Sequence, residues 1–439
     1  MSEGIVVNPL IISRLICGGN NIALRSKMVG TSIFMVGVST LLQVLVGTRL
    51  PIVQGSSPNM IAAITAMTTL ERFRCVAEVT TIMSVGNTTL HESKDTMYDD
   101  NWPMRINEIS GCLMLASVVQ ILLGLTGIVG FLMRFIGPLT ITPTISLISF
   151  TLMPISASLA STHWGVASMT IRHANNKCRW FGGHTSCYYC FNIVESVADY
   201  NACAKICQVP PPPAHAVNRG IAIEGLASLV SGSVGACHVT TSYSENIGVI
   251  GLTKVGSRMV FIMVGALLLV GGCVGKIGTA LALIPEPILG GVSIMTLGLL
   301  GAVGLSCIRY AECTSIRNLS ILGLAIYGGL MISNWMATHP NTINTGSHKL
   351  DQILTVFLST AMFFGGTIGF ILDNLVPGTP EERGILAWRG ENIPNKEGQL
   401  IKEDERTIYD IPYISGILKR HKVFKRFPFL PSFDTNMQT

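Results

Sequence analysis

The sequence predicts an all-α membrane protein that crosses the bilayer many times. Of its 439 residues, 49% are hydrophobic and only 13% are charged, and the mean hydropathy is +0.50, whereas soluble domains carry about 25% charged residues. Apolar stretches long enough to cross a hydrocarbon core of about 30 Å recur along most of the chain. These stretches are apolar on every face, while the strands of a membrane barrel alternate, so we expect helices.

The predicted membrane domain occupies residues 28–374, between a short N-terminal remnant (1–27) and a polar, charged tail (375–439) that we expect to be cytoplasmic. Residues 1–27 lack the basic, apolar and small-residue order of a cleavable signal peptide. About eleven spans are expected. They are 28–47, 51–70, 108–132, 136–160, 187–206, 220–236, 238–252, 258–278, 279–307 (long enough to be a re-entrant pair), 318–337 and 351–374.

The distribution of charge predicts the orientation in the membrane. Cytoplasmic loops retain Lys and Arg, and basic residues collect in the tail and in several short loops: Lys205, Arg219, Lys254, Arg258, Arg309, Arg317, Lys419, Arg420, Lys422, Lys425 and Arg426. The loop 71–105 is acidic and contains the sequon Asn87-Thr88-Thr89, so we expect it to be extracytoplasmic and glycosylated at Asn87. The net charge of +5 is thus explained by topology, and no nucleic-acid partner is expected.

Most of the 12 cysteines are single residues inside spans, where a thiol packs as a small hydrophobe. The segment "CRWFGGHTSCYYC" (178–190) has a spacing that could seat a metal ion, but no second pair of ligands accompanies it. We interpret it as a polar linker and expect no metal site.

Ionisable residues inside the predicted spans point to function, because a carboxylate in the membrane is costly unless it faces a cavity or a partner. Glu195 and Asp199 are four residues apart and so share one helix face. Glu245 and Asn246 lie next to each other in a segment rich in glycine, a residue that lets a helix end and its backbone face a ligand. The alternative, a buried lysine partner or a place in the headgroup zone, is less favoured because the apolar runs offer few basic residues. Together these residues predict a polar pocket.

The residues Glu245-Asn246-Ile247-Gly248, followed by Thr253-Lys254, resemble the signature of the nucleobase–ascorbate transporters. The flanking stretches 195–226, 343–356 and 370–388 resemble the animal members, solute carrier family 23, and the likeness extends from about residue 9 to 431. The resemblance implies two inverted repeats, a core domain that carries substrate, and a gate domain that forms a homodimer. It also implies that the third and tenth spans begin as short extended segments.

The resemblance assigns roles to individual positions. Glu195 is expected to accept hydrogen bonds from substrate, Glu245 and Ser57 to face it, and Asn246 to contact it or orient the tenth-span segment. Asp199 is expected to help couple the driving cation. The remaining signature residues, which are expected to shape the segment, are Gly248, Thr253 and Lys254.

Departures from the family pattern are concentrated in the first repeat. The chain has most of its first span missing relative to the family, and about a hundred residues with two spans are absent between Ile171 and Asn192. The third-span stretch reads "QGSSPNMIAA" (54–63), and Cys237-His238 replaces a glycine-rich stretch. We therefore expect an incomplete first repeat.

The predicted function is cation-coupled uptake, driven by sodium, of nucleobases such as uracil, hypoxanthine or xanthine across the plasma membrane. Glu245 favours a nucleobase, because ascorbate carriers resemble one another in having proline there and because a carboxylate would repel an anion. The alternatives are a sodium-dependent ascorbate transporter and a truncated, non-transporting isoform or subunit partner. No catalytic residues and no cofactor other than the coupling ion are expected, since no span carries a nucleophile with its base.

Overall fold

The computed structural model describes most of the membrane domain and two short pieces of the tail. The described residues are 3–19, 21–56, 61, 64, 102–129, 135–177, 190–238, 240–243, 246–247, 250, 253–339, 342–346, 348–386, 408–411 and 427–430. The described chain is almost entirely helical, which confirms the all-α fold class.

In chain order the helices are η1 (Glu3–Val7), α1 (Asn8–Leu15), α2 (Ile22–Leu45), α4 (Trp102–Thr126), α6 (Pro138–Ser161), α7 (Trp164–Lys177), α8 (Cys190–Ile206), α9 (Ala214–Ser233), α11 (Arg258–Cys273), α12 (Gly275–Ala282), α13 (Glu286–Ser306), η3 (Cys307–Tyr310), α14 (Ile316–Thr338), α15 (His348–Ser359) and α16 (Ala361–Leu375). Polar caps start two of the long helices: Asn21 Oδ1 accepts from Leu24 N at 3.0 Å, and Ser315 Oγ accepts from Asn318 N at 3.4 Å.

Among the described residues, five helices are long and apolar enough to cross a membrane, namely α2, α4, α6, α13 continued by η3, and α14. The pair α11–α12 adds a sixth if it counts as one span, although it is bent by 86°. Helix α12 ends at Ala282 and α13 begins at Glu286, so the predicted segment 279–307 contains the end of one helix and the whole of the next. The bend between α11 and α12 lies at Val274, beside Gly275. Extended backbone at Val274 interrupts the helical hydrogen bonds there. The total of eleven spans stays a prediction.

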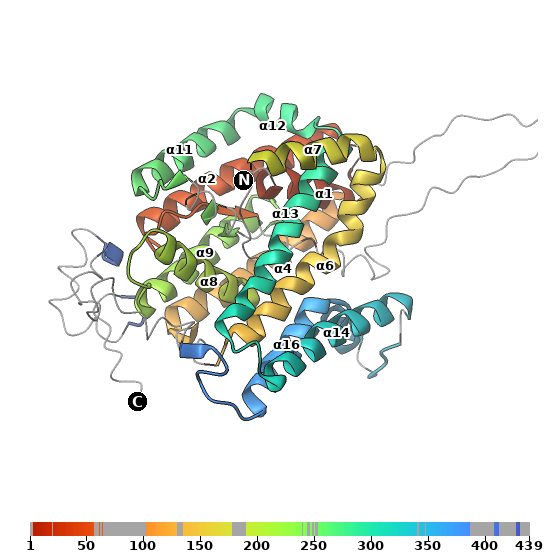
Figure 1. Ribbon diagram of the computed structural model, residues 1–439. Coiled ribbons are helices and arrows are strands. Elements are labelled where there is room, and N and C mark those ends of the chain that lie inside the picture. The colour runs from red at the N-terminus through yellow and green to blue at the C-terminus, as the bar shows by residue number, and fades with distance from the viewer. Residues whose placement is uncertain are drawn as a thin grey trace, which may run out of the picture.

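Helices from the two halves of the chain pack against each other in pairs (Figure 1). The order helix, strand, helix occurs twice, as α2–β1–α4 and as α9–β2–α11; α2 packs on α11, and α9 packs on α4. Small residues allow the close approach: a Cβ at Gly37 would lie 2.5 Å from Leu269 N, and one at Gly124 would lie 2.6 Å from Ala222 N. This exchange of partners is what two interleaved repeats produce.

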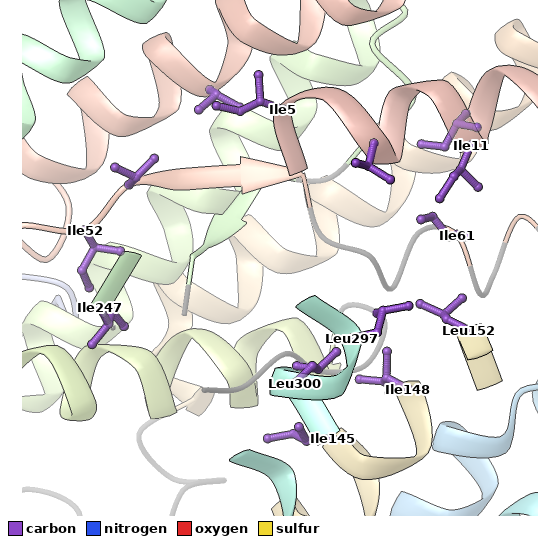
Figure 2. Close-up of a cluster of buried hydrophobic side chains, with 14 of the residues drawn as sticks. Ile5, Ile11, Ile52, Ile61, Ile145, Ile148, Leu152, Ile247, Leu297 and Leu300 are labelled. Carbon is purple, nitrogen blue, oxygen red and sulfur yellow. The ribbon is translucent and has the colours of Figure 1, made fainter. Parts of the chain in front are cut away.

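A second group of helices joins this body through α6. Helix α13 lies along α6, and α14 and α16 pack on each other and on α6 (Figure 1). Buried side chains from the start of the chain belong to the same hydrophobic cluster as those of α6 and α13; Figure 2 labels Ile5, Ile148 and Leu297 among its members. The hydrophobic core therefore runs continuously between the two groups of helices.

Candidate functional site

Two very short strands cross at the centre of the interleaved helices. Strand β1 (Gln54–Ser56) pairs antiparallel with β2 (Thr240–Ser242), with Gln54 opposite Ser242 and Ser56 opposite Thr240. All six residues are buried. The expectation of extended segments at the third and tenth spans is confirmed. Irregular backbone at this depth occurs in membrane proteins where it is enclosed by protein or lines a cavity.

Glu224 of α9 is the most heavily hydrogen-bonded side chain beside the strand pair. It is 1% exposed. Its Oε1 accepts hydrogen bonds from Tyr200 OH at 2.7 Å and from Ser242 Oγ at 2.8 Å, and its Oε2 accepts one from Ser196 Oγ at 2.5 Å. These donors come from α8 and β2, so the carboxylate connects two elements to α9.

A second ring of polar side chains holds these donors in place. Gln43 Nε2 of α2 donates to Tyr200 OH at 2.7 Å, which leaves the tyrosine hydrogen free to point at Glu224. Gln54 Nε2 of β1 donates to Ser242 Oγ at 3.2 Å. The Ser196 and Thr241 hydroxyls lie 3.0 Å apart. Side chains from α2, β1, α8, α9 and β2 thus form one buried network, which we call the Glu224 network.

None of the described Lys, Arg or His residues forms an ion pair with Glu224; the groups that donate to it are neutral, chiefly the hydroxyls of Ser196, Tyr200 and Ser242. Burying a carboxylate costs several kcal/mol, and neutral donors offset only part of that cost. Carboxylates that persist in membrane proteins under these conditions are typical of substrate or ion pathways.

Several buried polar atoms next to the strand pair have no hydrogen-bond partner within the described part of the chain. They are Asn8 Oδ1, Gln54 Oε1, Ser56 Oγ and Asn246 Nδ2. Asn8 belongs to α1 and reaches β1, where its Nδ2 donates to the Ser56 carbonyl at 2.8 Å. Besides the carboxylate, the region therefore offers two amide oxygens that accept, an amide nitrogen that donates and a serine hydroxyl that can do either, a set suited to a small polar ligand or a hard cation.

The structure brings some of the predicted site residues to this region. Asn246 is buried just beyond β2, and its backbone N–H donates to the Tyr243 carbonyl at 3.1 Å. Glu195 and Asp199 lie on the single helix α8, on either side of Ser196, and Asp199 is completely buried. The described part of the chain does not include the side chain of Glu195, nor residues Ser57, Glu245, Gly248 and Asn87. Their predicted roles stay predictions.

Thr253 and Lys254, which end the signature, are exposed, and neither donates to Glu224. Lys254 has a left-handed backbone (φ 58°), and its N–H donates to the Ile250 carbonyl at 2.8 Å. The predicted linker and metal-like segment falls outside the described residues up to position 189, and Cys190 begins α8.

Sequence reasoning missed Glu224, together with Asn8, Gln43 and Tyr200 around it. The signal for Glu224 was present, because it is the only acid in the predicted span 220–236. The rule that selected Glu195 and Glu245 applies equally to it. Nothing local marks Asn8, Gln43 or Tyr200, since their partners lie far away in the chain.

A buried strand pair between membrane-length helices, lined by an uncompensated carboxylate, defines a membrane transporter rather than an enzyme. Comparison with known proteins agrees: a family model described as "Permease family" matches residues 1–188 and 184–338. The chain belongs to the nucleobase–ascorbate transporter family.

Similar proteins include animal and plant members of that family. Solute carrier family 23 member 1 of Rattus norvegicus is 33% identical, with 98% of this chain and 85% of the relative covered. Solute carrier family 23 member 2 of Mus musculus is 34% identical, with 98% and 78% covered. Nucleobase-ascorbate transporter 11 of Arabidopsis thaliana is 27% identical, with 93% and 70% covered.

The form of these matches bears on the predicted gap in the first repeat. The alignment with member 1 runs over 523 positions, more than the 439 residues of this chain, so the relative has internal segments that are absent here. The permease-family model matches in two pieces that meet at residues 184–188, inside the interval where the missing spans were predicted.

Proposed function

We propose that this protein is a secondary-active transporter that uses a cation gradient, in the first place sodium, to take up nucleobases such as uracil, hypoxanthine or xanthine. The observation that carries the proposal is the Glu224 network, a buried carboxylate that meets only neutral donors beside a strand pair with free polar atoms.

The charge of the region favours a neutral substrate. Glu224 and Asp199 are both buried, and Glu195 lies on α8 one residue before Ser196. Carboxylates repel an anion in a low-dielectric pocket, whereas each N–H of a nucleobase can donate a charge-assisted hydrogen bond to one of them. Ascorbate, which is anionic at neutral pH, is therefore the second choice.

The same charge favours a cation as the driving ion. A hard cation selects oxygen ligands, and Gln54 Oε1 and Ser56 Oγ are buried oxygens without a partner in the described chain. A cation that binds near Glu224 would lower the cost of its charge only when substrate and cation are both present, which is the basis of coupling. Asp199 remains the residue proposed to assist in that coupling.

The test is radiolabelled uptake in cells that express the chain, with a panel of nucleobases and ascorbate, in sodium and in choline medium. Saturable, sodium-dependent uptake of a nucleobase is the expected result. Ascorbate uptake alone would overturn the substrate assignment, and equal uptake in both media would overturn sodium coupling.

Glu245→Pro sharpens the substrate test: it removes an acceptor and a backbone N–H together and should weaken nucleobase uptake. Wild-type affinity in that variant would remove Glu245 from the site.

A second candidate, a non-transporting partner of complete family members, is favoured by one observation. The alignment with solute carrier family 23 member 1 covers more positions than this chain has residues, so the relative has segments that are absent here, and we propose that they are the spans that complete the first repeat. Polar groups that those spans would cover are then left in lipid at a cost of several kcal/mol each. Under this proposal the chain alone reaches the surface poorly, and a variant with the missing residues restored between Ile171 and Asn192 transports. Robust uptake by the 439-residue chain excludes it.

A further inference from the structure

A separate cavity of about 280 Å³ lies away from the strand pair, at the ends of α2, α8 and α11. Three cationic side chains line it: Arg49 from the loop after α2, Lys254 before α11, and Arg258 at the start of α11. Cys207, just beyond α8, and Ile408 from the tail complete the wall. The predicted orientation places this cavity on the cytoplasmic side.

The positive charge of this cavity is poorly compensated. Arg49 Nε is buried and has no hydrogen-bond partner within the described chain. Burial, and next the charge of Arg258, lower the pKa of the Arg49 guanidinium, while Asp410 raises it. Among the described residues, Asp410 is the carboxylate whose charge acts on Arg49. Like charges held together in this way favour an anion between them.

The backbone positions two of the cations at some cost. Arg49 (φ 63°) and Lys254 (φ 58°) both adopt the left-handed conformation, which is unfavourable for residues with a side chain. Such strain persists only where the surrounding structure imposes it, and it collects at ligand-binding sites. Two strained cations on one cavity wall are a second sign of a built site.

The tail segment 408–411 contacts arginines at the edge of the cavity through backbone carbonyls, which do not neutralise their charge. Arg258 Nη2 donates to the Ile408 carbonyl at 3.0 Å, and Arg219 Nη2 donates to the Tyr409 carbonyl at 2.6 Å. Tyr409 is completely buried, and its hydroxyl donates to the Pro210 carbonyl at 2.5 Å. Both arginines thus bond neutral carbonyls, so their charge remains available.

We propose that this cavity binds a phosphate group, carried either by a soluble phosphate or by a phospholipid headgroup. Arg guanidinium groups bind phosphate oxygens with two parallel hydrogen bonds, and Lys adds a point charge. Helix α11 begins at the cavity, and its N-cap residue Ser257 makes no side-chain capping bond, so first-turn N–H groups also face this end. The volume is close to the lower limit of about 300 Å³ for small-molecule pockets. It therefore fits a small anion, and the site is independent of the transported substrate.

Cys207 provides the readout, because it is a free, half-buried thiol in the cavity wall. The full chain, purified in detergent, is alkylated with iodoacetamide in sodium phosphate or in sodium chloride of equal ionic strength, and labelling is followed by peptide mass spectrometry. Phosphate should slow labelling of Cys207 about tenfold, as expected for a charge-assisted contact of about 1.5 kcal/mol, and should leave the exposed Cys313 unaffected. Chain reconstituted in phosphatidylcholine vesicles with and without phosphatidic acid tests the lipid source; protection in either arm supports the phosphate site and identifies the source.

Two variants test the residues. Arg49→Gln and Arg258→Gln should each shift the phosphate midpoint about tenfold. Arg309→Gln, which changes an exposed arginine beside Tyr310, should not. Arg258→Gln also loses the bond to the Ile408 carbonyl and can therefore misfold. If Arg258→Gln elutes as aggregate, the test of the phosphate site rests on Arg49→Gln, because the Arg49 side chain makes no such bond within the described part of the chain.

Three results would overturn the proposal. One is equal labelling in phosphate and chloride together with no protection by phosphatidic acid. Another is protection that Arg49→Gln leaves unchanged. The third is protection that appears only after Glu403→Gln, Asp404→Asn and Glu405→Gln are combined, since the tail itself would then supply the anion.

Discussion

Two buried carboxylates, Glu224 in α9 and Asp373 near the end of α16, are treated very differently by their surroundings. Asp373 is completely buried and bonds two arginines: Arg383 Nε reaches its Oδ1 at 3.0 Å, and Arg317 Nη2 reaches the same oxygen at 3.2 Å. Glu224 is buried to the same degree but is surrounded by hydroxyls.

The difference separates a structural charge from a functional one. The Asp373 cluster joins α14, α16 and the segment after α16, and its charge is balanced within the protein. Under the proposed function, the charge of Glu224 is balanced by a substrate or cation that binds and is then released. Breaking each carboxylate should therefore have a distinct consequence, stability for one and transport for the other.

The largest expected effect on transport is that of Glu224→Gln. This variant keeps the shape of the side chain but removes the charge, and its amide N–H₂ opposes one of the hydroxyl donors. Loss of charge-assisted contacts worth about 1.5–3 kcal/mol each should lower uptake at least tenfold to a hundredfold. Uptake is measured per transporter at the surface, with Glu312→Gln, an exposed loop carboxylate, as control. Normal uptake in Glu224→Gln would show that its network is only structural.

Asp373→Asn should act on stability instead. It leaves Arg317 and Arg383 without their carboxylate, and breaking a buried ion pair costs about 3–5 kcal/mol. The thermal midpoint of the detergent-solubilised protein should fall, while the KM of the molecules that reach the surface should not change. Glu381→Gln, which alters an exposed carboxylate nearby, is the matched control. A changed KM with normal stability would contradict the comparison.

The effect of Glu195→Gln should be smaller than that of Glu224→Gln or Asp373→Asn and larger than that of Tyr200→Phe. If Glu195 accepts hydrogen bonds from substrate, removal of its charge should weaken apparent affinity about tenfold to a hundredfold with normal surface expression. Competition by unlabelled nucleobases measures this. Unchanged affinity would remove Glu195 from the pocket and leave Glu224 as the carboxylate that meets the substrate.

The sequence was sufficient for the long helices and insufficient for the Glu224 network, for a physical reason. Helices α2, α4, α6 and α14 follow from uninterrupted apolar stretches of membrane length. The bend at Val274, inside the predicted span 258–278, was not predicted, because glycines are no more frequent in α11 than in the continuous helix α13. A single sequence does not show which apolar run will break.

The strand pair and its neighbours depend on contacts between distant parts of the chain. Gln43 and Tyr200 are 157 positions apart, and Asn8 and Ser56 are 48 apart. Resemblance to the family predicted where the strands lie, but composition and periodicity carry no information on such pairs. Glu224 itself was detectable as the single acid of its span, while its partners were not.

Tyr200→Phe has the smallest expected effect and tests whether the ring around Glu224 matters beyond the carboxylate. The change removes the donor at 2.7 Å from Glu224 Oε1, and Gln43 Nε2 loses its acceptor. Ser196 and Ser242 still donate to the carboxylate, and Gln43 Nε2 keeps a long contact of 3.5 Å with Thr48 Oγ1. Of the two lost bonds only the one to Glu224 acts directly on the carboxylate; it is worth about 0.5–1.5 kcal/mol, which is roughly a threefold to tenfold change in apparent affinity. Tyr327→Phe, at a tyrosine that is 70% exposed on α14, is the matched control. If Tyr200→Phe abolished uptake as completely as Glu224→Gln, the tyrosine hydroxyl would be part of the binding site, because loss of a supporting bond alone is too weak for that result.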